Sequence, residues 1–221
     1  NFDSAFFYLK KAYYLDPTDP LNNYNLGSTL HLNLGLHEAA LPFLLQAVKA
    51  DPLDPNVYVH LGQVQGALGH FAEARKAFNT CYELTNENFQ QEFRLVFLFI
   101  QLGELDKAKK RIDLRKGANK WVESYYYAVK GEPDKVNPDF KDSPLILLAT
   151  NRNKILKDVV KKIESLLDQG ISDGLCSYDF LKNSPDVDAY REDSDFKRIL
   201  AKAKKLQETK MLKYGNIEMP E

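Results

Sequence analysis

Apolar residues recur in the first half of the chain at a helical spacing, and the whole pattern repeats with a longer period. Ala74, Phe78 and Cys81 stand at positions i, i+4 and i+7, which places them on one face of a helix. Equivalent alanines return every 34 or 35 residues, each followed four residues later by a large apolar side chain. The alanines are Ala5, Ala40, Ala74 and Ala108, and their followers are Leu9, Leu44, Phe78 and Ile112. This pattern predicts a repeated helix with one buried face.

Glycines and Asp-Pro pairs divide this pattern into units. Gly35, Gly69 and Gly103 each stand five residues before one of the alanines, where we expect left-handed caps that end a preceding helix. The pairs at 16–17 and 51–52 are expected to end the second helix of a unit. Glycines also follow a leucine at 26–27 and 61–62, as expected where two helices approach closely. The predicted unit is a helical hairpin.

These residues resemble the tetratricopeptide repeat, a unit of 34 residues with an aromatic residue, then Leu-Gly, Ala, Phe and Pro. Residues 55–88 match best, through Tyr58, Leu61-Gly62, Gly69, Ala74 and Phe78, with Asn86 where Pro is usual. The resemblance implies an all-α fold, a right-handed α-solenoid of helical hairpins.

Other segments match less completely. Residues 20–54 contain one extra residue between Gly27 and Gly35, and residues 89–116 have Val96 where a small residue is usual. Residues 2–19 match only the second helix of a repeat. Half a hairpin would expose Ala5 and Leu9 on a face suited to a preceding helix, so we expect the chain to be a fragment with further repeats or another domain upstream.

We expect three parts along the chain. Residues 1–116 form the repeat array, with a half repeat at 2–19 and repeats at 20–54, 55–88 and 89–116. Residues 117–144 form a degenerate repeat, with a helix over about 118–129, and a proline-containing connector. Residues 145–221 form a divergent hairpin and a C-terminal cap. In that hairpin the helix over 154–169 is expected to bury Ile155, Leu156, Val159, Val160, Ile163, Leu166 and Leu167.

Residues 184–200 resemble a C-terminal tail of bacterial tetratricopeptide proteins, with Ser184-Pro185 in place of Asp-Pro. Its expected role is to cover the open end of the stack with Val187, Tyr190, Phe196, Ile199 and Leu200. The neighbouring acids do not have the spacing of a calcium loop, because no glycine occupies the turn and Lys197 stands where the bidentate Glu belongs. Seven basic residues between 197 and 213 flank an apolar stripe and are interpreted as the solvated face of a helix.

Charge and composition exclude several classes. The 221 residues contain 30 Lys+Arg and 31 Asp+Glu, so the formal net charge of −1 gives no field that attracts nucleic acid or an anionic membrane. The purely apolar runs are far shorter than the ~20 residues of a spanning helix, which argues against membrane insertion. Two cysteines, at 81 and 176, exclude a disulfide scaffold and favour a reducing compartment such as the cytoplasm.

We find no pattern of catalytic or metal-binding residues. The histidines at 31, 37, 60 and 70 lack the spacing that brings two metal ligands onto one helix face, and they are interpreted as structural. No Gly-rich phosphate loop occurs, and neither cysteine has a nearby histidine. The sequence predicts a protein that is not an enzyme and needs no cofactor or metal.

The resemblance implies that the first helices of the hairpins line a concave groove that holds a peptide or partner helix. Helical phase predicts the side chains that face this groove, with Arg94 at its margin: Tyr24, Ser28, Val59, Gln63, Phe93, Phe97, Gln101, Trp121 and Tyr125. The first helices lack the lysine, arginine and asparagine set with which some relatives hold a terminal carboxylate. An alternative is that Phe93 and Phe97 are buried, by curvature or by the C-terminal half folding across the groove.

Two functions stay open. The first is a non-catalytic scaffold that binds a peptide or helical segment of a partner protein in the groove. The second is a sensory or regulatory arm of a larger signalling or transfer enzyme whose catalytic domain lies elsewhere. The sequence leaves the partner and the oligomeric state undetermined.

Overall fold

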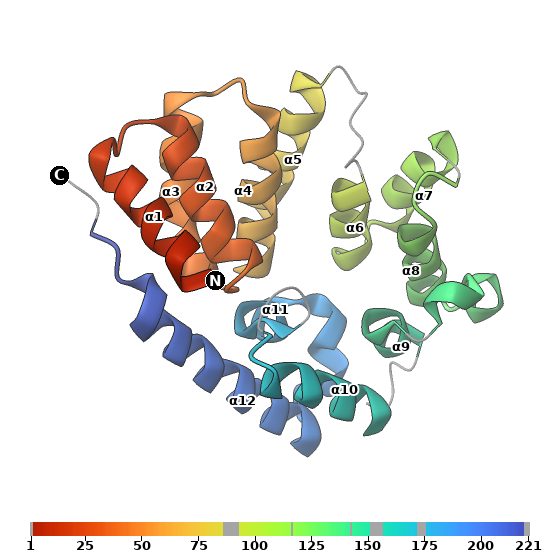
Figure 1. The fold of residues 1–221 in the computed structure, drawn as a ribbon. Coiled ribbons are helices and arrows are strands. Elements are labelled where there is room, and N and C mark those ends of the chain that lie inside the picture. Colours follow the sequence, from red (N-terminus) through yellow and green to blue (C-terminus); the bar gives the residue numbers. More distant parts are fainter. Residues whose placement is uncertain are drawn as a thin grey trace.

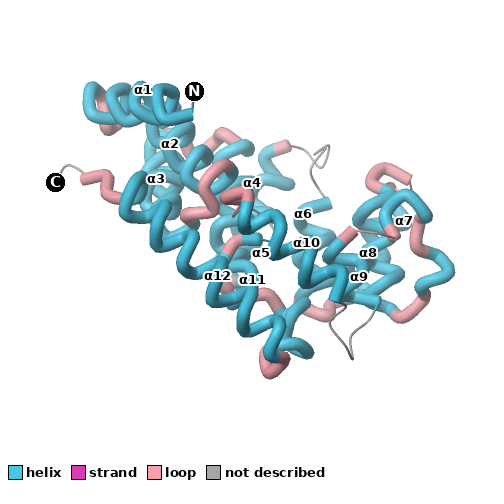
Figure 2. Tube along the Cα trace, turned by 60° about the horizontal axis from the view of Figure 1, so that its bottom comes forward, coloured by secondary structure: helices cyan, strands magenta, loops and turns pink. Residues whose placement is uncertain are grey.

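The protein is all-α. The computed structural model describes residues 2–85, 93–115, 117–141, 143–150, 157–171 and 176–218, and within these ranges helices are joined by turns without a strand (Figure 2). The prediction of an α-solenoid built from helical hairpins is confirmed. None of the described helices is long and apolar enough to cross a bilayer.

The helices of the repeat region pack as consecutive pairs (Figure 1). They are α1 (Phe2–Leu15), α2 (Pro20–Leu32), α3 (His37–Ala50), α4 (Pro55–Ala67), α5 (Phe71–Leu84), α6 (Phe93–Gln101), α7 (Leu105–Leu114) and α8 (Lys120–Lys130). The remaining elements are η1 (Pro133–Lys135), η2 (Pro138–Phe140), α9 (Pro144–Thr150), α10 (Lys157–Asp168), α11 (Tyr178–Asn183), η4 (Pro185–Tyr190), α12 (Ser194–Lys210) and the π-helical turn η5 (Met211–Gly215).

Glycines allow the helices of a pair to approach closely. A Cβ atom on Gly62 of α4 would lie 2.7 Å from Cε1 of Phe78 on α5, and one on Gly27 of α2 would lie 2.9 Å from Cγ of Leu44 on α3. The glycines at 35, 69 and 103 have φ angles of 65°, 81° and 72°, which confirms the predicted left-handed caps.

A second set of Asp-Pro pairs starts the first helices. Asp19 and Asp54 are the N-caps of α2 and α4, and Pro20 and Pro55 occupy the first helical turns. The Asp54 carboxylate accepts a hydrogen bond from the Asn56 amide at 2.9 Å. Such a cap satisfies an amide that has no partner within the helix, and proline at that point has no amide to satisfy.

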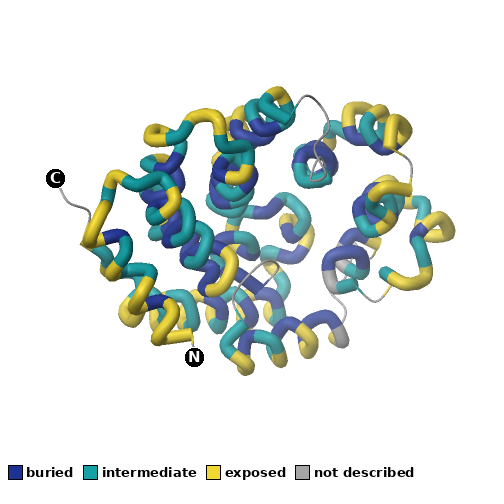
Figure 3. Tube along the Cα trace, turned by 45° about the horizontal axis from the view of Figure 1, so that its top comes forward, coloured by how far each residue is buried: buried dark blue, intermediate teal, exposed yellow. Residues whose placement is uncertain are grey.

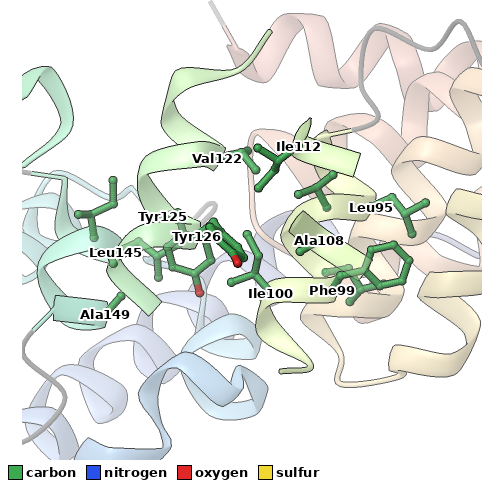
Figure 4. Close-up of a cluster of buried hydrophobic side chains, with 14 of the residues drawn as sticks. Leu95, Phe99, Ile100, Ala108, Ile112, Val122, Tyr125, Tyr126, Leu145 and Ala149 are labelled. Carbon is green, nitrogen blue, oxygen red and sulfur yellow. The ribbon is translucent and has the colours of Figure 1, made fainter. Parts of the chain in front are cut away.

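The interior forms three apolar clusters. The first joins α1 to α5, and the second joins α5 to α9, where side chains of α6, α7, α8 and α9 point toward one another (Figure 4). The third joins α10, α11, η4 and α12. Helices show buried positions on one side and exposed positions on the other (Figure 3). Of the expected C-terminal core residues, Val159, Val160, Ile163 and Leu167 are buried and Leu166 is half-buried, whereas Ile155 and Leu156 lie outside the described residues.

The segment from α11 to η4 lies against the first helices of the array. The Asn183 side-chain amide of α11 donates to the Ala67 carbonyl of α4 at 3.0 Å. The expected cap residues Val187, Tyr190, Phe196 and Ile199 are buried, and Leu200 is half-buried. They pack with α10 in the third cluster, while polar groups of η4 reach α6 and α8.

The end of the chain returns to its beginning. We call residues 194–217 the C-terminal strap: α12 runs from the α10–α11 region back to α1 (Figure 1). There the Tyr214 ring lies 5.2 Å from the Phe6 ring, and Lys213 pairs with Asp3 at 3.0 Å. Met211, Tyr214 and Ile217 join the first apolar cluster. The strap thus connects the C-terminal helices to the N-terminal helix.

Candidate functional site

A cavity of about 480 Å³ lies between the first helices and the C-terminal helices. This volume falls within the range of about 300–1,000 Å³ typical of small-molecule pockets. Helices α4, α6 and α8 supply one wall, and α10, α11, Ile171, Cys176 and Ser177 supply the other. Most of the lining side chains are apolar or aromatic: Phe78, Phe93, Phe97, Leu98, Trp121, Leu145, Leu166, Ile171 and Phe180.

Five of the nine residues predicted to face the groove line this cavity. They are Gln63, Phe93, Phe97, Gln101 and Trp121. The Phe97 ring centroid lies 5.8 Å from that of Trp121, and both side chains are half-buried. The structure therefore brings together the aromatic residues that the sequence places on successive first helices.

Two predicted residues on α2 lie outside the cavity lining. The half-buried Tyr24 packs edge-on against His60 of α4, with ring centroids 5.5 Å apart. Ser28 is half-buried, and its hydroxyl donates to the Asn25 carbonyl at 3.1 Å.

Val59 and Tyr125 are interior residues, which corrects their expected exposure in the groove. Val59 is 2% exposed, because α4 packs against α2, α3, α5 and α11 and is apolar on more than one side. Tyr125 is fully buried under Phe97 and Trp121, and its hydroxyl donates to Asp186 of η4. Both side chains are therefore part of the interior and do not line the groove.

The C-terminal segment already forms hydrogen bonds with a polar side chain of the groove. The Gln101 amide donates to Oγ of Ser184 at 3.2 Å and to Oδ2 of Asp186 at 2.7 Å. Leu145 and Leu166 face the same cavity as Phe93 and Phe97. The C-terminal half thus lies across part of the groove and leaves the two phenylalanines half-buried.

Polar side chains gather at the α2–α4–α6 end of the cavity. Arg94 of α6 is the one permanently charged side chain among the described residues that line it. Its Nε and Nη1 atoms are buried, and neither has a hydrogen-bond partner in the part of the chain that the structure describes. The guanidinium carbon lies 5.5 Å from the Phe93 ring centroid. Burial lowers the pKa of Arg94 from its ordinary value.

Three histidines lie beside this end. The His31 ring is 5.1 Å from the His37 ring and 5.9 Å from the His60 ring. Burial holds the pKa of His31 well below its usual range, with smaller effects of His37 and His60. Burial, with Arg94 nearby, lowers the pKa of His60 to about 4. A hydrogen bond with the Gln63 side chain has the opposite effect and raises the pKa of His31.

His37 has a different role, because its Nδ1 contacts Oδ2 of Asp179 on α11 at 2.9 Å and both side chains are buried. The described residues contain no group of three or more side chains suited to hold a metal ion. Sequence reasoning did not bring these histidines together. The available signal was His31 itself, which stands four residues after Gly27, a position where the next repeat has Gly66.

Comparison with known proteins identifies the repeated unit. Residues 22–52 and 55–88 match the family model described as tetratricopeptide repeat, and these ranges fall on the pairs α2–α3 and α4–α5. No curated protein and no solved structure matches the chain.

Proposed function

We propose that this chain is a non-catalytic scaffold that holds a peptide or helical segment of a partner, because residues 22–52 and 55–88 match the tetratricopeptide repeat and such repeats are protein-interaction modules. The observation that supports this proposal is the half-buried aromatic strip on successive first helices, formed by Phe93, Phe97 and Trp121.

The strip has the properties of a binding hot spot. Aromatic side chains bury much area at small entropic cost and dominate the energetics of interfaces. The strip borders a cavity that can accept an apolar side chain of the partner, and Tyr24 and Ser28 extend the surface along α2. Val59 and Tyr125 contribute by fixing the backbone and the Trp121 ring.

A second candidate is a sensory or regulatory arm of a larger signalling or transfer enzyme. The feature that favours it is the size of the cavity and its partial closure by the C-terminal helices, since a scaffold that only docks a partner needs no such space.

The scaffold proposal can be tested by selecting peptides from a displayed random library on the intact chain. We expect Phe97→Ala to weaken the selected peptide by roughly 1 kcal/mol or more, about fivefold in Kd, with an unchanged circular dichroism spectrum. Phe7→Ala is the matched control, because Phe7 lies on α1, outside the cavity, and is 62% exposed. Full binding by a Phe93, Phe97 double alanine variant would exclude this strip, and failure to enrich any peptide would exclude the groove.

A further inference from the structure

Buried nitrogens of Arg94 lie without partners at one end of the cavity. Nε and Nη1 of Arg94 have no hydrogen-bond partner among the described residues. Beside them lie the buried His31, which is 9% exposed, and the Gln63 side chain that hydrogen-bonds to it. Buried polar atoms in folded proteins nearly always have a partner, so the two Arg94 nitrogens beside a cavity indicate a group that binds there.

The charge of this end is positive. None of the described residues that line the cavity is an aspartate or glutamate, and Arg94 carries the permanent charge. Two buried guanidinium nitrogens without a partner among the described residues are unfavourable, because burial removes their hydration. Carboxylates are the anions that a planar guanidinium binds most directly, through paired N–H donors. The side-chain amide of Gln63 and a ring N–H of His31 can supply further donors.

The rest of the cavity is apolar. From Arg94 it extends past Phe97 and Leu98 to Trp121 and Leu145, with Leu166, Ile171 and Phe180 on the opposite wall. A small inorganic anion would leave this surface unfilled. A ligand that matches both ends has one negative charge and a hydrocarbon or aromatic body.

We propose that this cavity binds a small monocarboxylate with an apolar body, its carboxylate at Arg94, Gln63 and His31 and its body between Phe97 and Phe180. The ligand is a small molecule, so the proposal goes beyond the scaffold function and does not depend on it. The single charge of Arg94 matches a single carboxylate, and the volume of the cavity suits a small molecule.

Trp121 makes the test direct. It is the one tryptophan of the chain and lines the cavity, so its fluorescence reports on the contents of the cavity. Decanoate, 1-decanol, acetate and inorganic phosphate are titrated into the whole chain near pH 7. We expect decanoate to shift Trp121 emission saturably and to raise Tm, 1-decanol to bind at least tenfold more weakly, and acetate and phosphate to cause no shift.

Variants assign the carboxylate site. Arg94→Gln should weaken decanoate at least tenfold and leave the affinity for 1-decanol unchanged. Lys141→Gln is the control, because Lys141 is exposed and does not line the cavity. Leu166→Phe narrows the cavity from the opposite wall without adding a tryptophan and should weaken the binding of both decanoate and 1-decanol; it tests the same site if Arg94→Gln does not fold.

Three results would overturn the proposal. They are equal affinity of the wild-type chain for decanoate and 1-decanol, unchanged decanoate binding by Arg94→Gln, and no effect of decanoate on emission or Tm. The peptide selection on the Phe97 strip is a separate measurement, so either proposal can fail while the other holds.

Discussion

Gly62 has no side chain because the Phe78 ring fills the space where a Cβ atom would lie. The ring is 5% exposed and packs in the second apolar cluster, with one side bordering the cavity. Gly66, one turn later on the same helix, has a different environment: a Cβ atom there would have Ala74 Cβ as its nearest neighbour, at 3.9 Å. Two glycines of one helix are therefore under different constraints.

This difference predicts opposite effects of one substitution. Gly62→Ala should destabilise the fold by about 1–2 kcal/mol, because the overpacking exceeds the gain in helix propensity. Gly66→Ala should stabilise it by roughly 0.5–1 kcal/mol, because only the gain remains. Urea denaturation followed by circular dichroism measures both free energies of unfolding. Equal stability of the two variants would show that the Phe78 ring yields and that close approach is not the reason for Gly62.

At the residue level the repeat positions were predictable and the cavity was not. Gly35, Gly62 and Gly69 could be recognised because a helix cap or a close helix contact requires glycine at each, and these requirements recur with the period of the repeat. Arg94 and His31 belong to no such column. These two residues come together only when α2 and α6 stack, and the sequence of either helix alone does not predict that stacking.

At the scale of elements, the six-residue α11 is held in place by polar contacts as well as by the apolar packing of Leu181. Its buried Asp179 contacts Nδ1 of His37 on α3 at 2.9 Å and accepts a hydrogen bond from the Gln207 amide of α12 at 2.9 Å. One carboxylate thereby joins α11 and α12 to α3, which lies far from them along the chain.

Removing this carboxylate should be costly. Asp179→Ala leaves the His37 and Gln207 donors without their acceptor, and we expect a loss of about 2–4 kcal/mol in the free energy of unfolding. Asp188→Ala is the control, because it removes only an exposed carboxylate that pairs with Arg191 and should cost less than about 1 kcal/mol. Chemical denaturation compares the variants, and similar losses for both would show that Asp179 does not anchor α11.

The hairpins were predictable because each is formed by contacts within about one repeat. His37 and Asp179 are 142 positions apart in the chain, and no periodic pattern in the sequence predicts the contact between them. For the same reason helical phase indicated Val59 and Tyr125 as groove residues, although both are buried in the fold and the Tyr125 hydroxyl donates to Asp186 of η4. The fold class could be inferred from the local pattern, whereas the position of the C-terminal half across the groove could not.

At the scale of the molecule, the C-terminal strap connects the region of α10 and α11 to α1. Tandem-repeat arrays normally contact only their neighbours, so their ends are independent. Here Met211, Tyr214 and Ile217 pack in the cluster that contains Phe6 and Tyr13. The stability of α1 therefore depends on residues at the other end of the chain.

Truncation after Lys210 should expose the start of α1. The lost burial is on the order of 2 kcal/mol, which corresponds to a decrease in Tm of about 4–8 °C. Amide hydrogen exchange in residues 2–15 should become faster, with little change in α4 and α5. Truncation after Ile217 is the control and should alter neither quantity. Unchanged exchange in α1 after the longer truncation would show that the strap contributes no stability there.

The strap also determines when α1 can complete its packing during synthesis of the chain. Asp3 and Lys213 are 210 positions apart in the chain, and a ribosome adds about 5–20 residues per second. About 10–40 s therefore separate the synthesis of Asp3 from that of Lys213. Throughout this interval Phe2 and Phe6 lack the ring that later covers them. Helix α1 is thus synthesised before α2–α5 but completes its packing later, and α2–α5 must fold beside a helix that is still incompletely covered.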